Sequence, residues 1–136
     1  MAQSNGTDLG GYYRQIEENG LLLTEQDAQQ WSTAVLRALG PNLPRGTKKK
    51  LAKSLPEELA FDLTRKFWLL HFRNKNLPRQ EFLKEVARMS GNTDAQFAVH
   101  PTRAVFHELK QYAGNDVSET VAEALAPEVS ELWQQA

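Results

Sequence analysis

The chain has 136 residues, 40% of them hydrophobic and 24% charged, which predicts one ordinary globular domain or two very small domains packed together. The formal net charge of -1 excludes a molecule that is basic throughout, as generic polyanion binders are. The lack of cysteine excludes disulfides, thiolate nucleophiles and cysteine-ligated metal sites, and it fits a reducing compartment.

The amino end, residues 1–10, contains neither the basic region nor the apolar core of a signal peptide. We therefore expect it to form a flexible terminus. The most apolar run of the chain, Phe67–Phe72, is far too short to span a membrane. These features predict a cytoplasmic protein without membrane contact.

Apolar residues recur at helical spacing in the part of the chain that follows the terminus. Leu51, Leu55, Leu59 and Leu63, for example, are each four residues apart and share one helix face. The first three predicted helices are Tyr12–Asn19, ended by Gly20, about Glu25–Leu39, ended by Gly40-Pro41, and Lys48–Lys53.

A fourth helix has the clearest start signal. Ser54 is the predicted N-cap, Glu57 completes a capping box with it, and Pro56 occupies the first turn. The apolar residues of Phe67–Phe72 surround the helix axis, which is typical of a buried helix. We therefore expect this helix to continue to about Arg73, followed by a linker.

The remainder of the chain predicts the same series of helices. They are Pro78–Ser90, ended by Gly91, then about Pro101–Tyr112, then Val117–Ala124, and a last one around Pro127. No alternating apolar pattern is long enough for a strand. The predicted fold class is all-α.

The chain aligns with itself, because Gly11–Lys66 can be placed on Glu81–Ala136 without a gap. The matches concentrate on apolar positions, such as Leu39 with Leu109, although any two amphipathic helical stretches align to some extent. The alignment predicts a compact helical bundle built from two similar multi-helix halves. These are residues 11–76 and 77–136, packed together as one globular domain.

Three motifs of the second half resemble the bacterial domain-of-unknown-function family 2267. They are Phe82-Leu83 followed by Val86-Ala87, then Thr102-Arg103-Ala104-Val105-Phe106, and the ending Leu132-Trp133. The sequence departs from the family pattern at Ala126-Pro127, where Leu-Pro is usual. The resemblance implies a compact all-helical fold, often in two similar halves. It implies no activity and carries over no catalytic residue.

Candidate catalytic groups are few. His71 lies within an apolar run, and Pro101 separates His100 from His107. No spacing suits a zinc site, no glycine-rich loop suits a phosphate, and no serine stands in a nucleophile elbow. We therefore predict no enzyme activity, no cofactor, no metal and no small-molecule substrate. An enzyme using His100, His107 and Glu108 stays an alternative.

The charge distribution is the most informative feature. Residues 1–44 carry two basic and five acidic residues, and residues 80–136 carry four basic and nine acidic residues. Residues 45–79 carry ten basic and three acidic residues, so a basic centre lies between two acidic ends. The alignment of the two halves pairs Lys48-Lys49-Lys50 with Ser118-Glu119-Thr120. The predicted fold therefore tolerates either charge at this helix.

Two interpretations of the basic centre follow. The first is a protein–protein interaction or scaffold module that binds an acidic protein surface, including that of a second copy. The second is nucleic-acid binding through the same surface, for which no recognised reading motif is present. The predicted binding residues are Arg45, Lys48, Lys49, Lys50, Lys53, Arg65, Lys66, Arg73, Lys75 and Arg79.

Overall fold

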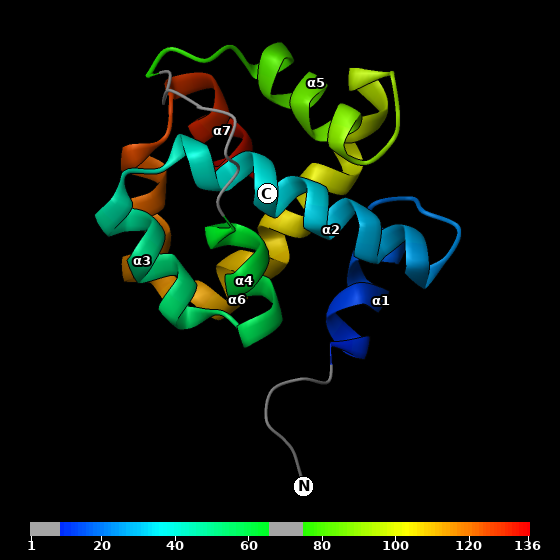
Figure 1. Ribbon diagram of the computed structural model, residues 1–136, viewed down its shortest axis with the longest axis horizontal. Coiled ribbons are helices and arrows are strands. Elements are labelled where there is room, and N and C mark those ends of the chain that lie inside the picture. Colours follow the sequence, from blue (N-terminus) through cyan, green and yellow to red (C-terminus); the bar gives the residue numbers. More distant parts are fainter. Residues whose placement is uncertain (1–8, 66–74) are drawn as a thin grey trace, which may run out of the picture.

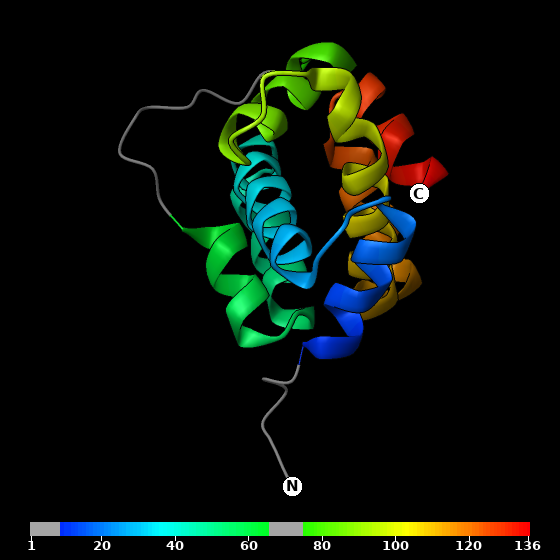
Figure 2. The same cartoon turned by 90° about the vertical axis from the view of Figure 1, so that its right-hand side faces the viewer.

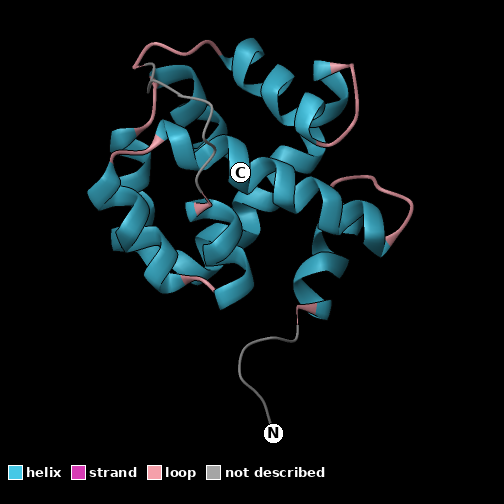
Figure 3. Cartoon of the chain, viewed as in Figure 1, coloured by secondary structure: helices cyan, strands magenta, loops and turns pink. Residues whose placement is uncertain are grey.

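The computed structural model describes residues 9–65 and 75–136, and all regular structure in these two ranges is helical (Figure 3). This confirms the predicted all-α fold. In Figure 1 the helices surround α2, which crosses the middle of the bundle. The helices are α1 (Gly10–Asn19), α2 (Glu25–Leu39), η1 (Gly40–Asn42), α3 (Arg45–Ser54), α4 (Glu57–Thr64), α5 (Arg79–Met89), η2 (Ala95–Ala98), α6 (Val99–Ala124) and α7 (Pro127–Gln135), where η denotes a 3-10 helix.

Helix starts recur at corresponding positions of the two aligned halves. The start of α4 at Glu57 aligns with that of α7 at Pro127, and the start of α2 at Glu25 aligns with that of η2 at Ala95. α6 is kinked at Gly114, whose φ is 77°, and the part after the kink, residues 115–124, aligns with α3. We call positions that this alignment pairs equivalent. These bounds support the repeat, which itself stays a prediction.

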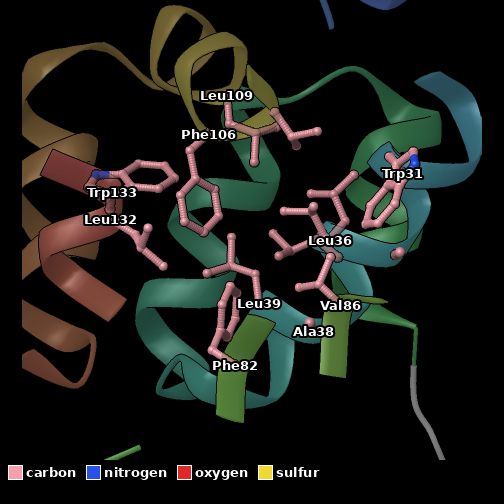
Figure 4. Close-up of a cluster of buried hydrophobic side chains, with 14 of the residues drawn as sticks. Trp31, Leu36, Ala38, Leu39, Phe82, Val86, Phe106, Leu109, Leu132 and Trp133 are labelled. Atoms are coloured by element: carbon pink, nitrogen blue, oxygen red, sulfur yellow. The ribbon is translucent and has the colours of Figure 1, made fainter. Parts of the chain in front are cut away.

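The core is built around α2, which packs against α1, α4, α5 and α6. Figure 4 shows Leu39 of α2 between the rings of Phe82 and Phe106, and Leu36 of the same helix near Val86. The ring of Phe106 lies 6.0 Å from that of Phe82 and 5.2 Å from that of Trp133, centroid to centroid. All of these side chains are fully buried. Burial of such large apolar side chains supplies most of the free energy of folding.

The predicted capping box before α4 is wrong. Ser54 is the last residue of α3, and its Oγ donates a hydrogen bond to the Leu51 carbonyl at 2.7 Å. The N-cap of α4 is Pro56, which makes no side-chain capping bond. α3 extends one residue beyond its predicted end, so the extended residue Leu55 separates the two helices.

The fourth helix is shorter than predicted. α4 ends at Thr64, and Arg65 has a non-helical ψ of 124°, so an unbroken helix to Arg73 is wrong. The Thr64 hydroxyl bonds back to the Ala60 carbonyl at 2.8 Å, and such bonds compete with the regular helix. The apolar run Phe67–Phe72, whose helix was predicted from its composition, lies outside the described residues.

The first and fifth helices end with the same backbone geometry. Gly20 and its equivalent Ser90 are both right-handed, with φ of -85° and -87°. The next residue is left-handed in both places, with φ of 58° at Leu21 and 86° at Gly91. Gly91 therefore has the predicted conformation, whereas the first half places a leucine there.

α6 begins at Val99, two residues earlier than predicted. Pro101 therefore lies in the first turn, where a backbone N–H would have no acceptor within the helix, so proline is tolerated. Within the described ranges, no helix combines the length and the apolar character needed to cross a membrane.

Candidate interaction surface

α3 carries a stripe of exposed cations. Arg45, Lys49 and Lys53 are each four residues apart and exposed, so they follow one another along one face of the helix. Lys50 is exposed beside them, and Lys48 is half-buried at the edge. Leu51 is the one fully buried side chain of α3, so most of this helix faces solvent. We call these five basic residues the α3 basic stripe.

Apart from Lys53, which lies in the last turn where the helix dipole favours a cation, the basic stripe receives no electrostatic support from α3 itself. The helix follows Pro44, has no side-chain N-cap and has no acidic residue in its first turn. Positive charge in the first half of a helix opposes the macrodipole, and like charges four residues apart repel. α4 shows the opposite arrangement, with Glu57 and Glu58 in its first turn. The basic stripe therefore lowers the stability of the helix that carries it.

No acidic side chain of the described residues offsets this cost by direct pairing. The ion pairs within 4.0 Å in residues 9–65 and 75–136 are Lys84–Glu81 and Arg88–Glu85, both on α5. The basic stripe takes part in neither.

The equivalent helix, residues 115–124, is acidic and is anchored by Trp133. Glu119 and Glu123 are equivalent to Lys49 and Lys53, and Asp116 adds a third carboxylate at the position equivalent to Gly46. The Trp133 Nε1 donates to the carbonyl and hydroxyl oxygens of Ser118, both at 3.1 Å. Glu119 and Glu123 border an open hollow of about 350 Å³ beside the buried Trp133 ring. The same helical position thus has opposite charge in the two halves.

The other predicted basic residues that the structure describes, Arg65, Lys75 and Arg79, lie outside α3. In Figure 1, α3 lies at the left and the segment leading into α5, which contains Lys75, lies at the top. The half-buried Arg79 uses its backbone N–H to donate to Glu128 Oε1 at 2.9 Å. The exposed Arg65 lies 5.9 Å from the Phe61 ring on α4, in a cation–π contact. Lys66 and Arg73 lie outside the described residues.

The histidine alternative is partly assembled by the fold. His100, Arg103 and His107 line one open hollow of about 300 Å³ on α6, and Arg103 donates to Gln135 at 3.3 Å. Burial raises the pKa of Glu108, an effect that His107 partly offsets. Within the described residues, no group of three or more histidines and carboxylates could hold a metal ion. His71 lies outside those residues.

Sequence reasoning missed an exposed apolar cluster. Leu21 and Leu23, between α1 and α2, and Phe97 of η2 are 68%, 89% and 52% exposed. Figure 2 faces the side of the bundle that carries these two segments. The available signal was the run Leu21-Leu22-Leu23 between a helix stop and a helix cap, where turn residues are usually polar.

The fold and its surfaces define an all-α helical bundle with charged and apolar candidate interaction faces. The chain belongs to the family described as uncharacterized conserved protein (DUF2267), whose model matches residues 11–132. This confirms the resemblance to domain-of-unknown-function family 2267. No curated protein matches the chain. The family description names no activity, so function is argued from the surfaces.

Proposed function

We propose that this protein is a non-enzymatic interaction or scaffold module that binds an acidic protein surface through the α3 basic stripe. The observation that carries the proposal is the stripe itself. Its cations repel one another, Arg45 in the first turn opposes the helix dipole, and none of the five pairs with an acidic side chain of the described residues. A partner of negative charge would offset these costs. The cysteine-free sequence fits a cytoplasmic location, which is part of the proposal.

A second copy of the chain provides one such acidic surface. Residues 115–124 present Asp116, Glu119 and Glu123, and the hollow bordered by Glu119 and Glu123 is open to solvent. Contact between α3 of one copy and this helix of the next would be head-to-tail. Oppositely charged patches accelerate encounter and fix orientation. Screening by salt would weaken the contact.

The test uses a charge-exchanged variant of α3. Lys48→Ser, Lys49→Glu and Lys50→Thr give α3 the residues of its equivalent, Ser118-Glu119-Thr120, so the fold should accept them. Sedimentation velocity at about 0.05 M and about 0.5 M salt should show association of the unmodified chain that salt and the variant both abolish. Binding to poly-glutamate, followed by anisotropy, tests an acidic partner other than the chain itself.

Two results would decide against an acidic protein partner. One is a salt-independent monomer that also fails to bind poly-glutamate at low salt. The other is poly-glutamate binding that the charge-exchanged variant retains in full. The variant Lys84→Glu on α5 is the matched control for a generic loss of positive charge, because Lys84 is exposed and belongs to a different helix.

The second candidate function is nucleic-acid binding. The observation in its favour is that the α3 stripe runs over Arg45–Lys53 without an acidic residue. Release of counterions from phosphates would give binding that falls steeply with salt. The acidic parts on either side would repel a long polyanion. Anisotropy with labelled single-stranded and duplex DNA and RNA should show binding at about 0.05 M salt that the charge-exchanged variant loses, and failure to bind there excludes this function.

A further inference from the structure

The exposed cluster of Leu21, Leu23 and Phe97 surrounds two adjoining hollows. One has about 230 Å³ and is lined by all three side chains, and the other has about 300 Å³ and shares Leu21 and Phe97 with it. The Trp31 ring lies 6.1 Å from the Phe97 ring in a stacked arrangement and is 6% exposed, so it forms a rigid apolar floor. We call these three exposed side chains and Trp31 the apolar patch.

Leu21 contributes little to the stability of the folded chain. Its φ of 58° is left-handed, a conformation that glycine adopts freely and that a leucine side chain disfavours. The equivalent residue is Gly91, with φ of 86°. The side chain of Leu21 is 68% exposed, so burial does little to compensate for the strained backbone. Strained residues of this kind often mark binding sites.

The patch rests on a fixed support. The Gln30 side-chain amide donates to the Ser90 carbonyl at 2.9 Å, which ties α2 to the end of α5 beneath the smaller hollow. Asp94 accepts a hydrogen bond from the Gln96 backbone N–H at 2.9 Å and so caps η2. A partner would therefore meet a surface that is already shaped, which lowers the entropic cost of binding.

The charge around the patch is negative. Asp27 lines one hollow and Asp94 the other, the remaining polar lining is neutral amide and hydroxyl groups with His100 at one edge, and neither hollow is lined by lysine or arginine. Both acidic parts of the chain contribute to it, since α2 and the loop before η2 come from different halves. An apolar surface with an acidic rim complements an apolar segment that carries basic residues.

We propose that the apolar patch binds a basic amphipathic segment of another protein. Its leucine or aromatic side chains enter the two hollows beside Phe97, and its lysine or arginine side chains meet Asp27 and Asp94. The α3 helix of a second copy does not supply leucine or aromatic side chains, because the exposed residues of α3 are Arg45, Gly46, Lys49, Lys50 and Lys53. The patch is therefore a second interaction face, independent of the stripe.

The probe is a fluorescein-labelled synthetic helix of about 14 residues made of leucine and lysine in an amphipathic pattern. The matched peptide has glutamate in place of lysine. Anisotropy with the full chain should show that the lysine peptide binds at least about tenfold more tightly than the glutamate peptide. Backbone NMR shifts on binding should centre on residues 21–23 and 94–97.

Four variants locate the site. Leu23→Ser, at a position 89% exposed, carries no folding risk and should weaken binding about tenfold, as should Phe97→Ser. Asp27→Asn and Asp94→Asn should weaken binding by a smaller factor, because each removes one rim charge. Phe61→Ser is the control, since Phe61 is 60% exposed on α4, and it should leave binding unchanged.

Several outcomes would overturn this site. Equal binding of the two peptides removes the acidic-rim argument, and NMR shifts centred on residues 115–124 place the peptide elsewhere. Loss of binding with Phe61→Ser equal to that with Leu23→Ser would show a nonspecific apolar effect. Sedimentation of the unmodified chain as a dimer that Leu23→Ser converts to monomer would make a second copy the occupant. The charge-exchanged α3 variant should keep full peptide binding, which separates this face from the proposed function.

Discussion

α3 and residues 115–124 of α6 are paired by the alignment of the two halves, and they are alike in backbone and opposite in charge. Both are followed by an extended leucine, Leu55 with ψ of 152° and Leu125 with ψ of 154°. The next helix begins in both places after a residue with φ of -54°, Pro56 or Ala126. Yet one helix is basic and the other acidic. The backbone conformation therefore depends on buried apolar residues such as Leu51 and Val121, and it does not require a particular surface charge.

The two helices also differ in how the following helix holds them. Trp133 of α7 is fully buried and donates its Nε1 hydrogen to Ser118, at the start of the acidic helix. The equivalent residues are Leu63 of α4 and Lys48 of α3, and a leucine side chain has no such donor. The acidic helix is thus held by packing and a polar bond, whereas within residues 9–65 α4 packs against α3 without an equivalent side-chain bond.

Of the substitutions that test this comparison, Trp133→Ala should cause the largest loss in the free energy of unfolding. Loss of the buried ring leaves a cavity beside Phe106 and removes the bond to Ser118, so we expect a loss of about 3–5 kcal/mol in the free energy of unfolding. Urea unfolding measures it. Leu63→Ala, the equivalent change, removes only packing and should cost less, about 2–4 kcal/mol. An equal or larger cost for Leu63→Ala would contradict the stronger anchoring of the acidic helix.

Gly40→Ala should cause the next largest loss in the free energy of unfolding. A Cβ at position 40 would lie 2.2 Å from the Leu63 carbonyl oxygen, a backbone atom that cannot move aside cheaply. We expect a loss of about 1–3 kcal/mol or more, measured by thermal and urea unfolding. The equivalent residue is Lys110, whose Nζ instead donates to the Trp133 and Ala136 carbonyls at 3.0 Å.

Gly46→Ala is the matched control for Gly40→Ala. Gly46 lies within α3, and a Cβ there meets nothing within 4 Å. Alanine should therefore raise the free energy of unfolding by about 0.5 kcal/mol, through helix propensity alone. If both substitutions were neutral or both destabilising by the same amount, the close approach at Gly40 would not be the cause.

The sequence predicted the elements that depend on periodic burial. The bounds of α2, Glu25–Leu39, follow from its apolar spacing and from Gly40-Pro41, and the structure has the same bounds. Local cap chemistry was less reliable, because a serine hydroxyl can either accept from the N–H groups of a following helix or donate to a preceding carbonyl, and here Ser54 ends α3 and donates to Leu51. The sequence marks Trp133 as apolar, but its bond to Ser118 depends on a tertiary contact that spacing alone does not reveal.

The candidate surfaces were predictable only in part. Exposed lysines follow directly from charge and helical spacing, so the α3 stripe could be found from the sequence. The separation of Lys75 from that stripe depends on where α5 packs. The apolar patch joins Leu23 of the first half to Phe97 of the second, and its strain lies in the φ of Leu21. The periodic pattern of apolar residues predicts neither the proximity of Leu23 to Phe97 nor the φ of Leu21.

The charge-exchanged variant of α3 should have a small stabilising effect. Lys48→Ser, Lys49→Glu and Lys50→Thr remove repulsion within α3 and place a carboxylate four residues from both Arg45 and Lys53, so we expect a gain of about 0.5–1 kcal/mol. Urea unfolding at low salt measures this gain, which high salt should reduce. The opposite exchange, Ser118→Lys, Glu119→Lys and Thr120→Lys, should destabilise the acidic helix. A stability loss in α3 would show that its lysines are structural.

The smallest predicted effect on stability concerns two carboxylates at positions where the other half has apolar residues. Asp62 is equivalent to Leu132, and Glu108 to Ala38. Burial raises the pKa of Asp62, partly offset by the hydrogen bond that Thr33 donates at 3.2 Å and by Arg37 and Arg65. Burial likewise raises the pKa of Glu108, partly offset by His107. Each ionised carboxylate is thus less favourable in the folded than in the unfolded chain.

A raised folded-state pKa fixes the direction of the pH dependence. The folded chain keeps these protons at a pH where the unfolded chain has lost them, so the contribution of both groups to stability grows as the pH falls toward their unfolded pKa values, near 4. Above their folded-state pKa values both are ionised and that contribution is absent. The effect is modest because water reaches both carboxylates and screens them.

Asp62→Asn with Glu108→Gln isolates this contribution, since Thr33 can still donate to an amide oxygen. All other groups titrate alike in the variant and the unmodified chain, so the difference between their free energies of unfolding removes them. That difference should favour the variant more at about pH 7 than at about pH 4, as measured by urea unfolding. A difference that does not change with pH, or that changes in the opposite sense, would show that burial does not control these two carboxylates. In that case the apolar equivalents Leu132 and Ala38 would be a poor guide to the environment of positions 62 and 108.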